Sequence, residues 1–493
     1  MAKTASFLSV AGLNLDRQDE TPLHRQLYEQ LRELIWTGRL PPGSRLPPTR
    51  DLAQELGLSR STVVEAIQQL ASEGFVVGRQ GAGTFVNSEL PEAAFAPGRA
   101  TAAPAMPQPV APRLSQRGQR SLLGHASRTG AGLPFQPGLP ETATFPFKIW
   151  RKLLNRRWQA PDYRALAYGD PAGYLPLREQ IAQHVATSRG VHCTPAQVII
   201  TSGTQQAIGL ALQLLTDPGD TVWLENPGYS GARHAMQGAG LDIVPVPVDE
   251  QGLVVDAGLE RAPAARLAYV SPSHQYPAGG IMSLARRRQL LGWAAGQNAW
   301  ILEDDYDSEY RYAGHPLASL QGLDQTGNVL YSGTFSKVLF PGLRLGYLIV
   351  PAGLEGAFAT ARGHADRGSC QVTQQVLHDF MAAGHLARHI RRMRTLYMER
   401  QAVLVDALAE HCGQWIATRP APAGLHLVGW LPAGWEDAAV SARLAEAGII
   451  APALSGYSLA PLNRGGLVLG YAAVDEGTIR ATVRRMGLLL RSG

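Results

Sequence analysis

Cysteine is scarce in this chain of 493 residues, which contains only Cys193, Cys370 and Cys412. No two of them have the spacing of a CxxC pair. This usage excludes a disulfide framework and a paired-cysteine zinc site, and it is typical of proteins from a reducing compartment. We therefore expect three inert, buried thiols and no metal ion.

Long apolar runs are also missing. The opening segment, MAKTASFLSVAGLNLDRQ, contains no apolar core of signal-peptide length and no cleavage site. No later stretch reaches the roughly 20 consecutive apolar residues that a membrane-spanning helix needs. We therefore expect a cytoplasmic protein that has no contact with a membrane.

The chain has no strong excess of charge of either sign. Its 45 lysines and arginines and its 40 aspartates and glutamates give a net charge of +5. This balance permits an acidic partner such as nucleic acid but does not demonstrate one, because many basic enzymes bind none. The positions of the charges must therefore identify any such partner.

The length predicts at least two domains, because one hydrophobic core rarely extends over so many residues. Residues 88–132 are dominated by alanine, proline, arginine and small polar residues, a composition that cannot pack a core. We predict a small domain over residues 1–87, a linker over 88–132 and a large domain over 133–493. In the large domain, apolar runs such as TVWLE and AWILEDD alternate with helical patterns, which predicts an α/β fold with a mostly parallel sheet.

The small domain has the pattern of a winged helix-turn-helix. Apolar residues at helical spacing predict a first helix over residues 23–36. The segment PPTRDLAQELGLSRSTVVEAIQQLASEGF predicts two further helices separated by the LGLS turn, with Thr49 and Ser59 as their N-caps. FVVGRQGAGTFV then predicts two short strands joined by a glycine-rich loop, which would be the wing.

Several residues of the small domain are candidates for contact with DNA. At the start of the second helix of the helix-turn-helix, side chains and free backbone N–H groups can meet phosphates and base edges in a major groove. Taken singly, each arginine is more simply a solvated surface charge. Together the arginines occupy the turn, both helices and the wing. The candidates are Arg45, Arg50, Ser59, Arg60, Ser61, Thr62, Arg79, Gly81, Gly83 and Thr84.

The same segment resembles a known DNA-binding domain. From PPGSRLPPTRDLAQELGLSRS to GRQGAGTFV, it resembles the winged helix-turn-helix of GntR-family regulators over nearly its whole length. The resemblance implies operator DNA as a partner. It places Arg45, Arg50, Arg60, Thr62 and the stretch from Gly81 to Thr84 at or near that DNA.

The large domain carries a lysine motif, YSGTFSKVLFPGLRLGY. Lys337 follows an apolar strand and a turn, so it would stand at the C-terminal end of a strand, where open α/β sheets bind ligands. Nearby hydroxyls and Arg344 could hold a phosphate. In isolation, such a lysine is more simply a surface residue. The hydroxyls in question belong to Ser332, Thr334 and Ser336.

An acidic pair follows another apolar strand, in WILEDDYDSEY. Asp304 and Asp305 would be costly to bury without a positive partner, and a protonated pyridinium nitrogen is such a partner. Tyr306 lies two residues after Asp304, so both side chains would leave the same side of the strand and could contact one cofactor. The alternative is an acidic strand end that holds water or a metal ion.

Three further strand ends carry candidate ligands. In VIITSGTQQAIGLALQLL, Ser202 and Thr204 begin a helix whose N–H groups could bind a phosphate. Tyr229 could stack on a pyridine ring, or it could serve a purely structural Pro-Gly-Tyr turn. His274 and Gln275 could bond to the hydroxyl O3′ of such a ring, while the alternative for His274 is a satisfied buried histidine.

These elements, in this order, resemble the fold-type I pyridoxal phosphate (PLP) enzymes of the aminotransferase superfamily, from about Leu133 to the C-terminus. Together with the GntR-like domain they resemble MocR/GabR-type regulators. The resemblance implies a large domain with a smaller α+β domain after it, PLP as cofactor, and a homodimer in which each DNA-binding domain packs on its partner's PLP domain. It also implies residue roles. Lys337 would form the Schiff base, Asp304 would bind the pyridine nitrogen, Tyr306 would bind O3′, Tyr229 would lie over the ring, and the phosphate would be held by Ser202, Gly203, Thr204, Thr334 and Arg344.

One departure from the aminotransferase pattern bears on the ligand. Aminotransferases carry an arginine before a C-terminal strand that binds the substrate's α-carboxylate, but here the segment reads RGGLVLGYAAV, with Leu467 or Val468 at that position and Arg464 out of register. This puts bidentate carboxylate binding in doubt. The pattern is more similar to PdxR-type members, which sense PLP and control vitamin B6 synthesis.

Three functions therefore remain open. The chain could be a PLP-dependent regulator that senses a ligand, either PLP or an amino acid. It could be a working aminotransferase with an accessory DNA-binding domain, which the missing arginine disfavours. It could also be a simple repressor that has lost the cofactor, which the intact lysine, acid and phosphate motifs disfavour. The fold alone cannot decide between sensing and turnover.

Overall fold

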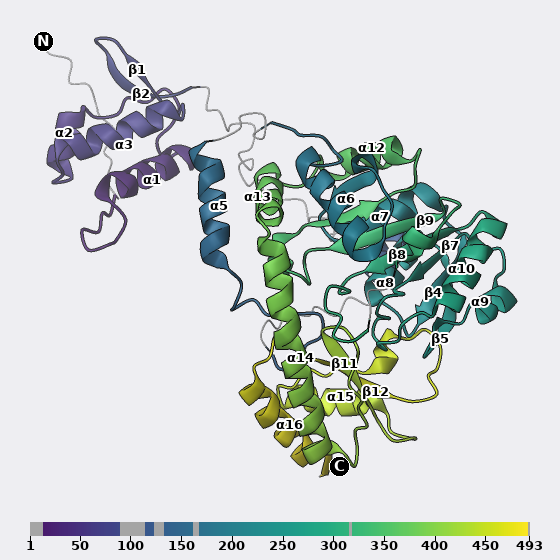
Figure 1. Ribbon diagram of the computed structural model, residues 1–493. Helices are drawn as coiled ribbons and strands as arrows, with labels where there is room; N and C mark the ends of the chain where they lie inside the picture. The colour runs from purple at the N-terminus through teal and green to yellow at the C-terminus, as the bar shows by residue number, and fades with distance from the viewer. Residues whose placement is uncertain (1–12, 89–113, 123–132, 161–166, 315–317, 492–493) are drawn as a thin grey trace, which may run out of the picture. The chain divides into compact units, whose positions relative to one another are not determined.

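A computed structural model describes residues 13–88, 114–122, 133–160, 167–314 and 318–491 of the chain (Figure 1). The chain forms two compact units, residues 1–112 and 113–493. Most of the predicted linker, residues 89–113 and 123–132, lies outside the described residues.

The first unit is a winged helix-turn-helix, as predicted. Its apolar core lies between the first and third helices, where Leu27 and Leu31 are buried together with Val63 and Leu70. The two strands form an antiparallel hairpin with Val76 opposite Val86. The elements are α1 (Leu23–Trp36), α2 (Thr49–Glu55), α3 (Arg60–Ser72), β1 (Val76–Arg79) and β2 (Gly83–Val86).

Of the two predicted N-caps, one is correct. Ser59 caps α3, and its Oγ accepts a hydrogen bond from the backbone N–H of Thr62 at 3.2 Å. Thr49 is instead the first residue of α2, and the N-cap position is held by Pro48 without a side-chain bond. The ring of Pro48 fixes φ, here at −53°, so the proline already supplies the extended backbone that precedes the helix.

Replacing Ser59 by alanine is expected to lower the free energy of unfolding of this unit by about 1 kcal/mol, because the Thr62 N–H loses its partner. Amide hydrogen exchange of residues 60–72 in the full-length protein would measure this change separately from the second unit. The exposed Ser88 provides a matched control, Ser88→Ala. Unchanged exchange in α3 of the Ser59 variant would contradict the capping role.

The second unit is built on an eight-stranded sheet of order β3-β10-β9-β8-β7-β4-β5-β6. The strands from β9 through β8, β7 and β4 to β5 are parallel, whereas β10 runs antiparallel to both of its neighbours and β6 antiparallel to β5. The predicted mostly parallel sheet is confirmed. The strands are β3 (Val198–Thr201), β4 (Thr221–Asn226), β5 (Asp242–Asp249), β6 (Gly252–Leu253), β7 (Leu267–Val270), β8 (Trp300–Asp305), β9 (Val329–Thr334) and β10 (Gly346–Ile349).

Helices cover both faces of this sheet (Figure 1). Leu224 and Leu302 pack on one face with α7, α8 and α12. Trp223 and Ile301 pack on the other, where the ring of Trp293 in α10 stacks on Trp223 at 3.9 Å. The helices are α5 (Phe147–Gln159), α6 (Leu175–Arg189), α7 (Thr204–Leu215), α8 (Ser230–Ala239), α9 (Val255–Arg261), α10 (Leu284–Gln297), α11 (Leu320–Leu323), α12 (Glu355–Asp366) and α13 (Gln371–Ala382).

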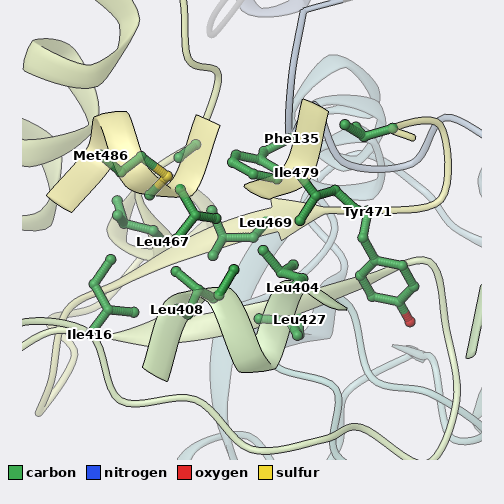
Figure 2. Packing of buried hydrophobic residues seen from close by; sticks show 14 of the residues in the cluster. Phe135, Leu404, Leu408, Ile416, Leu427, Leu467, Leu469, Tyr471, Ile479 and Met486 are labelled. Atoms are coloured by element: carbon green, nitrogen blue, oxygen red, sulfur yellow. The ribbon is translucent and has the colours of Figure 1, made fainter. Parts of the chain in front are cut away.

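A smaller α+β part follows, as the resemblance implied. Its two-stranded sheet is covered by helices, and Leu467 and Leu469 pack against Leu404 and Leu408 of the longest helix, as Figure 2 shows. The same helix begins in the core of the large sheet, where Leu386 is buried with residues of α6 and α13. The elements are α14 (His385–Cys412), β11 (His426–Trp430), α15 (Asp437–Glu446), β12 (Gly466–Gly470) and α16 (Glu476–Arg491).

Two expectations need correction. The predicted linker contains a short helix, α4 (Gln116–Ser121), capped by Ser115 and packed against α8. The Ser115 cap stabilises this helix, which buries no side chain. Its apolar content therefore could not predict it. The thiols are not all buried, since only Cys412 is buried while Cys370 is exposed.

The described ranges contain no group of three or more metal-ligating side chains, and none of their helices is long and apolar enough to cross a membrane.

Candidate cofactor site and DNA-binding surface

Lys337 stands just beyond the C-terminal end of β9. Its Nζ donates a hydrogen bond to the carbonyl oxygen of Gly138 at 2.6 Å. Burial lowers the pKa of Lys337, while the negative charges of Asp307 and Asp304 oppose this shift. A lowered pKa increases the fraction of neutral, nucleophilic amine, which is the form that attacks an aldehyde.

Asp304 lies one residue before the end of the neighbouring strand β8, and one of its carboxylate oxygens has no hydrogen-bond partner among the described residues. Its Oδ2 accepts a hydrogen bond from the Tyr269 hydroxyl at 2.5 Å, while Oδ1 is buried and has no partner among the described residues. Burial raises the pKa of Asp304 to about 7, and the hydrogen bond from Tyr269 opposes this shift. A cationic N–H at Oδ1 would satisfy the orphaned atom and keep the carboxylate charged.

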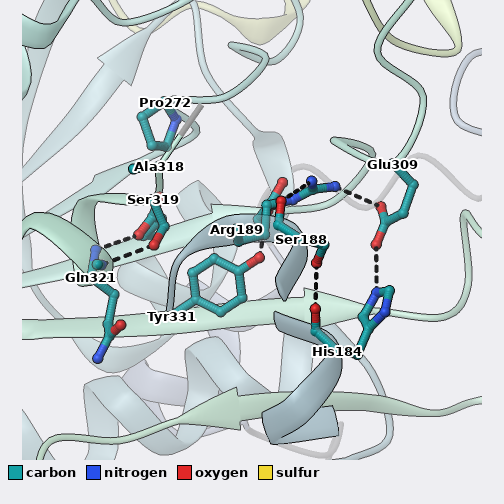
Figure 3. Close-up of polar contacts among 12 residues, drawn as sticks. His184, Ser188, Arg189, Pro272, Glu309, Ala318, Ser319, Gln321 and Tyr331 are labelled. Atoms are coloured by element: carbon teal, nitrogen blue, oxygen red, sulfur yellow. Dashed lines mark hydrogen bonds and ion pairs between the residues drawn. The ribbon is translucent and has the colours of Figure 1, made fainter. Parts of the chain in front are cut away.

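Asp305, the second member of the acidic pair, faces the opposite side of the sheet. Its Oδ2 accepts hydrogen bonds from Arg189 Nε at 3.0 Å and from the Tyr331 hydroxyl at 2.5 Å. Figure 3 shows Arg189 between Tyr331 and Glu309. The positive partner expected for the pair is therefore, for Asp305, an arginine of α6. Asp304 has no ion pair of this kind among the described residues.

Tyr306 lies beside two polar residues. Its hydroxyl is 2.9 Å from Nδ1 of His274, and that nitrogen is 2.9 Å from Oδ2 of Asp307. All three side chains are buried. Asp304 and Tyr306 are far from Lys337 in the sequence. The parallel pairing of β8 with β9 brings the ends of their strands to the same edge of the sheet.

Aromatic rings line the space near Asp304. The ring of Tyr229 stacks on that of Tyr269 with centroids 6.3 Å apart, and the ring of Tyr276 meets Tyr229 edge-on at 5.9 Å. Tyr229 lies beyond the end of β4 and directly precedes α8. These flat apolar surfaces suit an aromatic ligand.

Two of the predicted phosphate residues, Gly203 and Arg344, lie close together at the start of α7. Gly203 has φ +120°, and a Cβ there would lie 3.7 Å from a guanidinium nitrogen of Arg344. Thr334 accepts a hydrogen bond from the Ser336 N–H at 3.2 Å. The arginine and the helix N-terminus, which begins at Thr204, both favour an anion. Ser202 lies next to Gly203 on the same turn.

Gln275 makes other contacts. Its Nε2 donates to Glu225 Oε2, to Pro227 O and to Tyr276 O at 2.8–3.1 Å. These bonds connect the ends of β7 and β4. The prediction that Gln275 bonds to a cofactor stays a prediction, and its amide nitrogen is already engaged.

No arginine occupies the expected carboxylate position. Leu467 is buried in the core under α14, and Val468 faces the other way, where it packs with Val428, Leu454 and Tyr457. The Nε of Arg464 donates to the carbonyl oxygen of Leu431 at 2.7 Å. The guanidinium of Arg464 is thus held on the loop before β12.

The candidate DNA-binding residues lie on the surface of the first unit. Ser59, Arg60 and Ser61 are exposed at the start of α3, and Thr62 is half-buried beside them. Arg50 is exposed on α2. The start of α3 thus presents a hydroxyl-rich, cationic end to solvent.

Two arginines, Arg79 and Arg45, contact residues of the wing. The guanidinium of Arg79 lies 4.9 Å from the centre of the Phe85 ring. A Cβ at Gly83, where φ is +113°, would lie 2.8 Å from Nε of Arg45, so glycine permits this close approach. Gly81 also has a positive φ, +76°, at the tip, and Thr84 is half-buried.

Several site residues could not be chosen from the sequence. Tyr269, Tyr276, Asp307 and His426 all lie at the site, and His426 packs beside His274 with ring centroids 5.3 Å apart. Asp307 was visible as the fourth acid of the EDDYD run, and Tyr276 as the neighbour of Gln275. Tyr269 and His426 carried no signal of their own.

A winged helix-turn-helix joined to a unit whose strand ends gather a lysine, an aspartate and an arginine beside a helix N-terminus defines a DNA-binding regulator with an aminotransferase-type domain. Residues 23–86 match the family described as bacterial regulatory proteins, gntR family, and residues 140–486 match aminotransferase class I and II. The chain belongs to these families and is a MocR-type transcriptional regulator.

Several named regulators match this chain over nearly its whole length and theirs. The chain is 39% identical to the probable rhizopine catabolism regulatory protein MocR of Rhizobium meliloti, over 96% of this chain and 95% of that protein. It is 34% identical to the pyridoxine biosynthesis transcriptional regulator PdxR of Corynebacterium glutamicum, over 96% and 97%. It is 32% identical to the regulator TauR of Rhodobacter capsulatus, over 95% and 96%.

Two solved aminotransferases share the fold of the second unit. Kynurenine aminotransferase of Pyrococcus horikoshii, in complex with PMP, aligns with a TM-score of 0.68 at 28% identity, covering 74% of this chain and 92% of that one. LysN, an α-aminoadipate aminotransferase of Thermus thermophilus complexed with N-(5'-phosphopyridoxyl)-L-leucine, aligns with a TM-score of 0.68 at 29% identity, covering 73% and 92%. Both structures hold a pyridoxyl group.

Proposed function

We propose that this regulator binds PLP on Lys337 and responds to PLP itself. When bound, PLP supplies an aldehyde for an amine, a pyridine nitrogen and a phosphate. Lys337 offers the amine, the free Oδ1 of Asp304 suits the pyridine N–H, and the pair of Gly203 and Arg344 at the start of α7 suits the phosphate. Each demand of the cofactor has a matching group at the strand ends.

The other residues of the site would hold the ring and the phosphate of the cofactor in place. Tyr306 would hold O3′ of the ring, and Tyr229 would lie over its face. Ser202, Thr204 and Thr334 would add donors for the phosphate. His274 and Gln275 belong to the wall behind Tyr306 and Tyr276.

The observation that favours PLP over an amino acid as effector is the apolar environment of Val468. An amino acid's carboxylate would be desolvated against Val428, Val468 and Leu454, which costs several kcal/mol unless a donor replaces the water. Arg464 is engaged at Leu431. PLP needs no carboxylate clamp, so the same wall does not penalise it. We therefore propose that the protein controls vitamin B6 synthesis, the role that the name of the PdxR relative gives to that protein.

The regulatory step requires two states. We propose a homodimer in which each DNA-binding unit packs on the partner's second unit, and in which PLP binds one arrangement of the two DNA-binding units more tightly than the other. Only such differential affinity can shift the equilibrium. A twofold dimer would match an operator with two half-sites. An operator-binding role would place the protein in the cytoplasm.

The test is a pair of titrations with full-length protein at fixed salt, using an operator selected in vitro from random duplexes. PLP added to the apo protein is expected to change operator affinity by roughly 5- to 150-fold, the usual range of allosteric coupling. Amino acids and ω-amino acids added to the PLP-loaded protein should change neither its visible spectrum nor its affinity. Pyridoxine 5'-phosphate, which lacks the aldehyde, is the matched control ligand.

A different pattern would support a different function. The name of the MocR relative refers to a different pathway, rhizopine catabolism, and an amino-acid sensor is the main alternative. A spectral shift and a change in operator affinity with some amino acid, and none with PLP, would establish it. Sustained turnover of an amino acid with a keto acid would instead indicate a working aminotransferase.

A further inference from the structure

Three buried side chains behind the cofactor site form a short chain of polar contacts. Asp307 Oδ2 lies 2.9 Å and Asp307 Oδ1 3.2 Å from Nδ1 of His274, and the same nitrogen lies 2.9 Å from the Tyr306 hydroxyl. His274 and Asp307 have exposed fractions of 2% and 1%. Water therefore does not compete for these contacts.

The chemistry of the three groups fixes the direction of the hydrogen bonds. An ionised Asp307 can only accept, so Nδ1 of His274 must carry the hydrogen that lies between them. Nε2 of His274 is buried without a partner among the described residues, and an N–H there would lack an acceptor. The ring thus carries its single hydrogen on Nδ1, and the Tyr306 oxygen beside that nitrogen can only accept from it.

The consequence concerns the proton of Tyr306. Because Nδ1 already carries a hydrogen, the Tyr306 hydroxyl cannot donate to His274. Its own hydrogen is left to point away from His274, and Asp304 is among the charged groups near this hydroxyl. The Tyr306 hydroxyl is thereby available to donate its hydrogen to a ligand.

The surrounding backbone is shaped around the His274 ring. A Cβ at Gly424, where φ is +102°, would overlap the ring, and a Cβ at Gly279 would lie 3.5 Å from its Nε2. The ring of Tyr276 meets Tyr306 edge-on at 5.7 Å. A side chain at Gly424 would displace the imidazole, so the backbone around it leaves room for the ring only where it now lies.

We propose that His274 and Asp307 are positioning residues that hold the Tyr306 hydroxyl as a hydrogen-bond donor toward O3′ of the cofactor. This inference rests on the proposed PLP site. It assigns His274 an indirect role, through Tyr306, in place of a direct contact with the cofactor, and it adds Asp307 to the site.

Other charged groups surround this chain of contacts. Asp304 and Asp305 precede it on β8, and Glu309 follows it. Lys337 approaches from β9, and His426 from β11. Any pH profile of the site contains their contributions, so only differences between matched variants are informative.

The test uses the full-length PLP-loaded protein and the pH midpoint of the cofactor's visible absorption band. A donor to O3′ stabilises its anionic form, so its loss should raise the midpoint. His274→Phe and Tyr306→Phe are each expected to raise it by about one unit, and the double variant by no more than Tyr306→Phe alone. Asp307→Asn keeps an acceptor for Nδ1–H and should shift the midpoint by less than Asp307→Leu.

Controls separate the possible failures. Asp437→Asn, which changes another buried carboxylate far along the chain on α15, should leave the midpoint in place. If His274→Phe does not fold, the comparison of Asp307→Asn with Asp307→Leu still tests the inference. A wild-type midpoint in the His274 and Asp307 variants, or additive shifts in the double variant, would overturn the inference. A wild-type protein that takes up no PLP would overturn the proposed function itself.

Discussion

Lys337→Ala is expected to abolish covalent attachment of PLP completely, together with the visible absorption band of the bound cofactor. Burial lowers the pKa of the Lys337 amine, and the charges of Asp307 and Asp304 oppose this shift. The chain contains only four lysines, at positions 3, 148, 152 and 337. Borohydride reduction followed by peptide mass spectrometry can therefore assign the attachment site without ambiguity.

The other lysines supply the controls for this experiment. Lys148 and Lys152 are exposed on α5, and their alanine variants should be labelled like the wild type. Noncovalent uptake of PLP by Lys337→Ala is compatible with the proposal, because the phosphate and ring contacts remain. Label found at Lys148 or Lys152 in the wild type, or persisting in Lys337→Ala, would show that the lysine is wrongly assigned.

Arg60→Ala is expected to weaken operator binding by about 1–3 kcal/mol, roughly 5- to 150-fold, if the guanidinium reads a base. Arg60 is the first residue of α3 and is exposed beside the capping Ser59. Titrations with operator and with unrelated duplex at several salt concentrations separate base reading from phosphate contact, because loss of a phosphate contact weakens both and reduces the salt dependence.

Arg39 offers a matched arginine in the same unit. It is exposed on the turn after α1, away from the helix-turn-helix sequence, so Arg39→Ala should leave the operator affinity close to that of the wild type. Equal affinities for Arg60→Ala and wild type at fixed salt would remove the start of α3 from the DNA interface. The effect of Arg50→Ala would then show whether α2 is involved instead.

Much of the architecture could be predicted because its signals are local. The helix predicted over residues 23–36 matches α1 (Leu23–Trp36), since apolar spacing and the residues that end a helix lie within one segment. The positions of Lys337, Asp304 and Tyr229 relative to their strands were also predictable, because each motif combines an apolar strand with the polar residue that ends it.

The parts that could not be predicted depend on residues far apart in the chain. The partner of Asp305 is Arg189, which is 116 residues away and ends a helix with no special motif. His274 meets Asp307 across 33 residues, and His426 reaches the same place from a strand of the smaller part. A pattern read along one segment cannot show which distant side chain satisfies a buried charge, because tertiary packing decides it.

Helix α14 connects two hydrophobic cores as a single rod. Its first turns, with Leu386 and Ile390, are fixed in the core of the large sheet, and its later turns, with Leu404 and Leu408, in the core that contains Leu467. At 1.5 Å per residue its 28 residues extend over about 42 Å, so a tilt of about 5° at one end displaces the other by roughly 4 Å. The helix can therefore transmit a displacement from one core to the other. A small adjustment of the packing around the cofactor site would be amplified into a displacement of the whole smaller part, without any loop having to unfold.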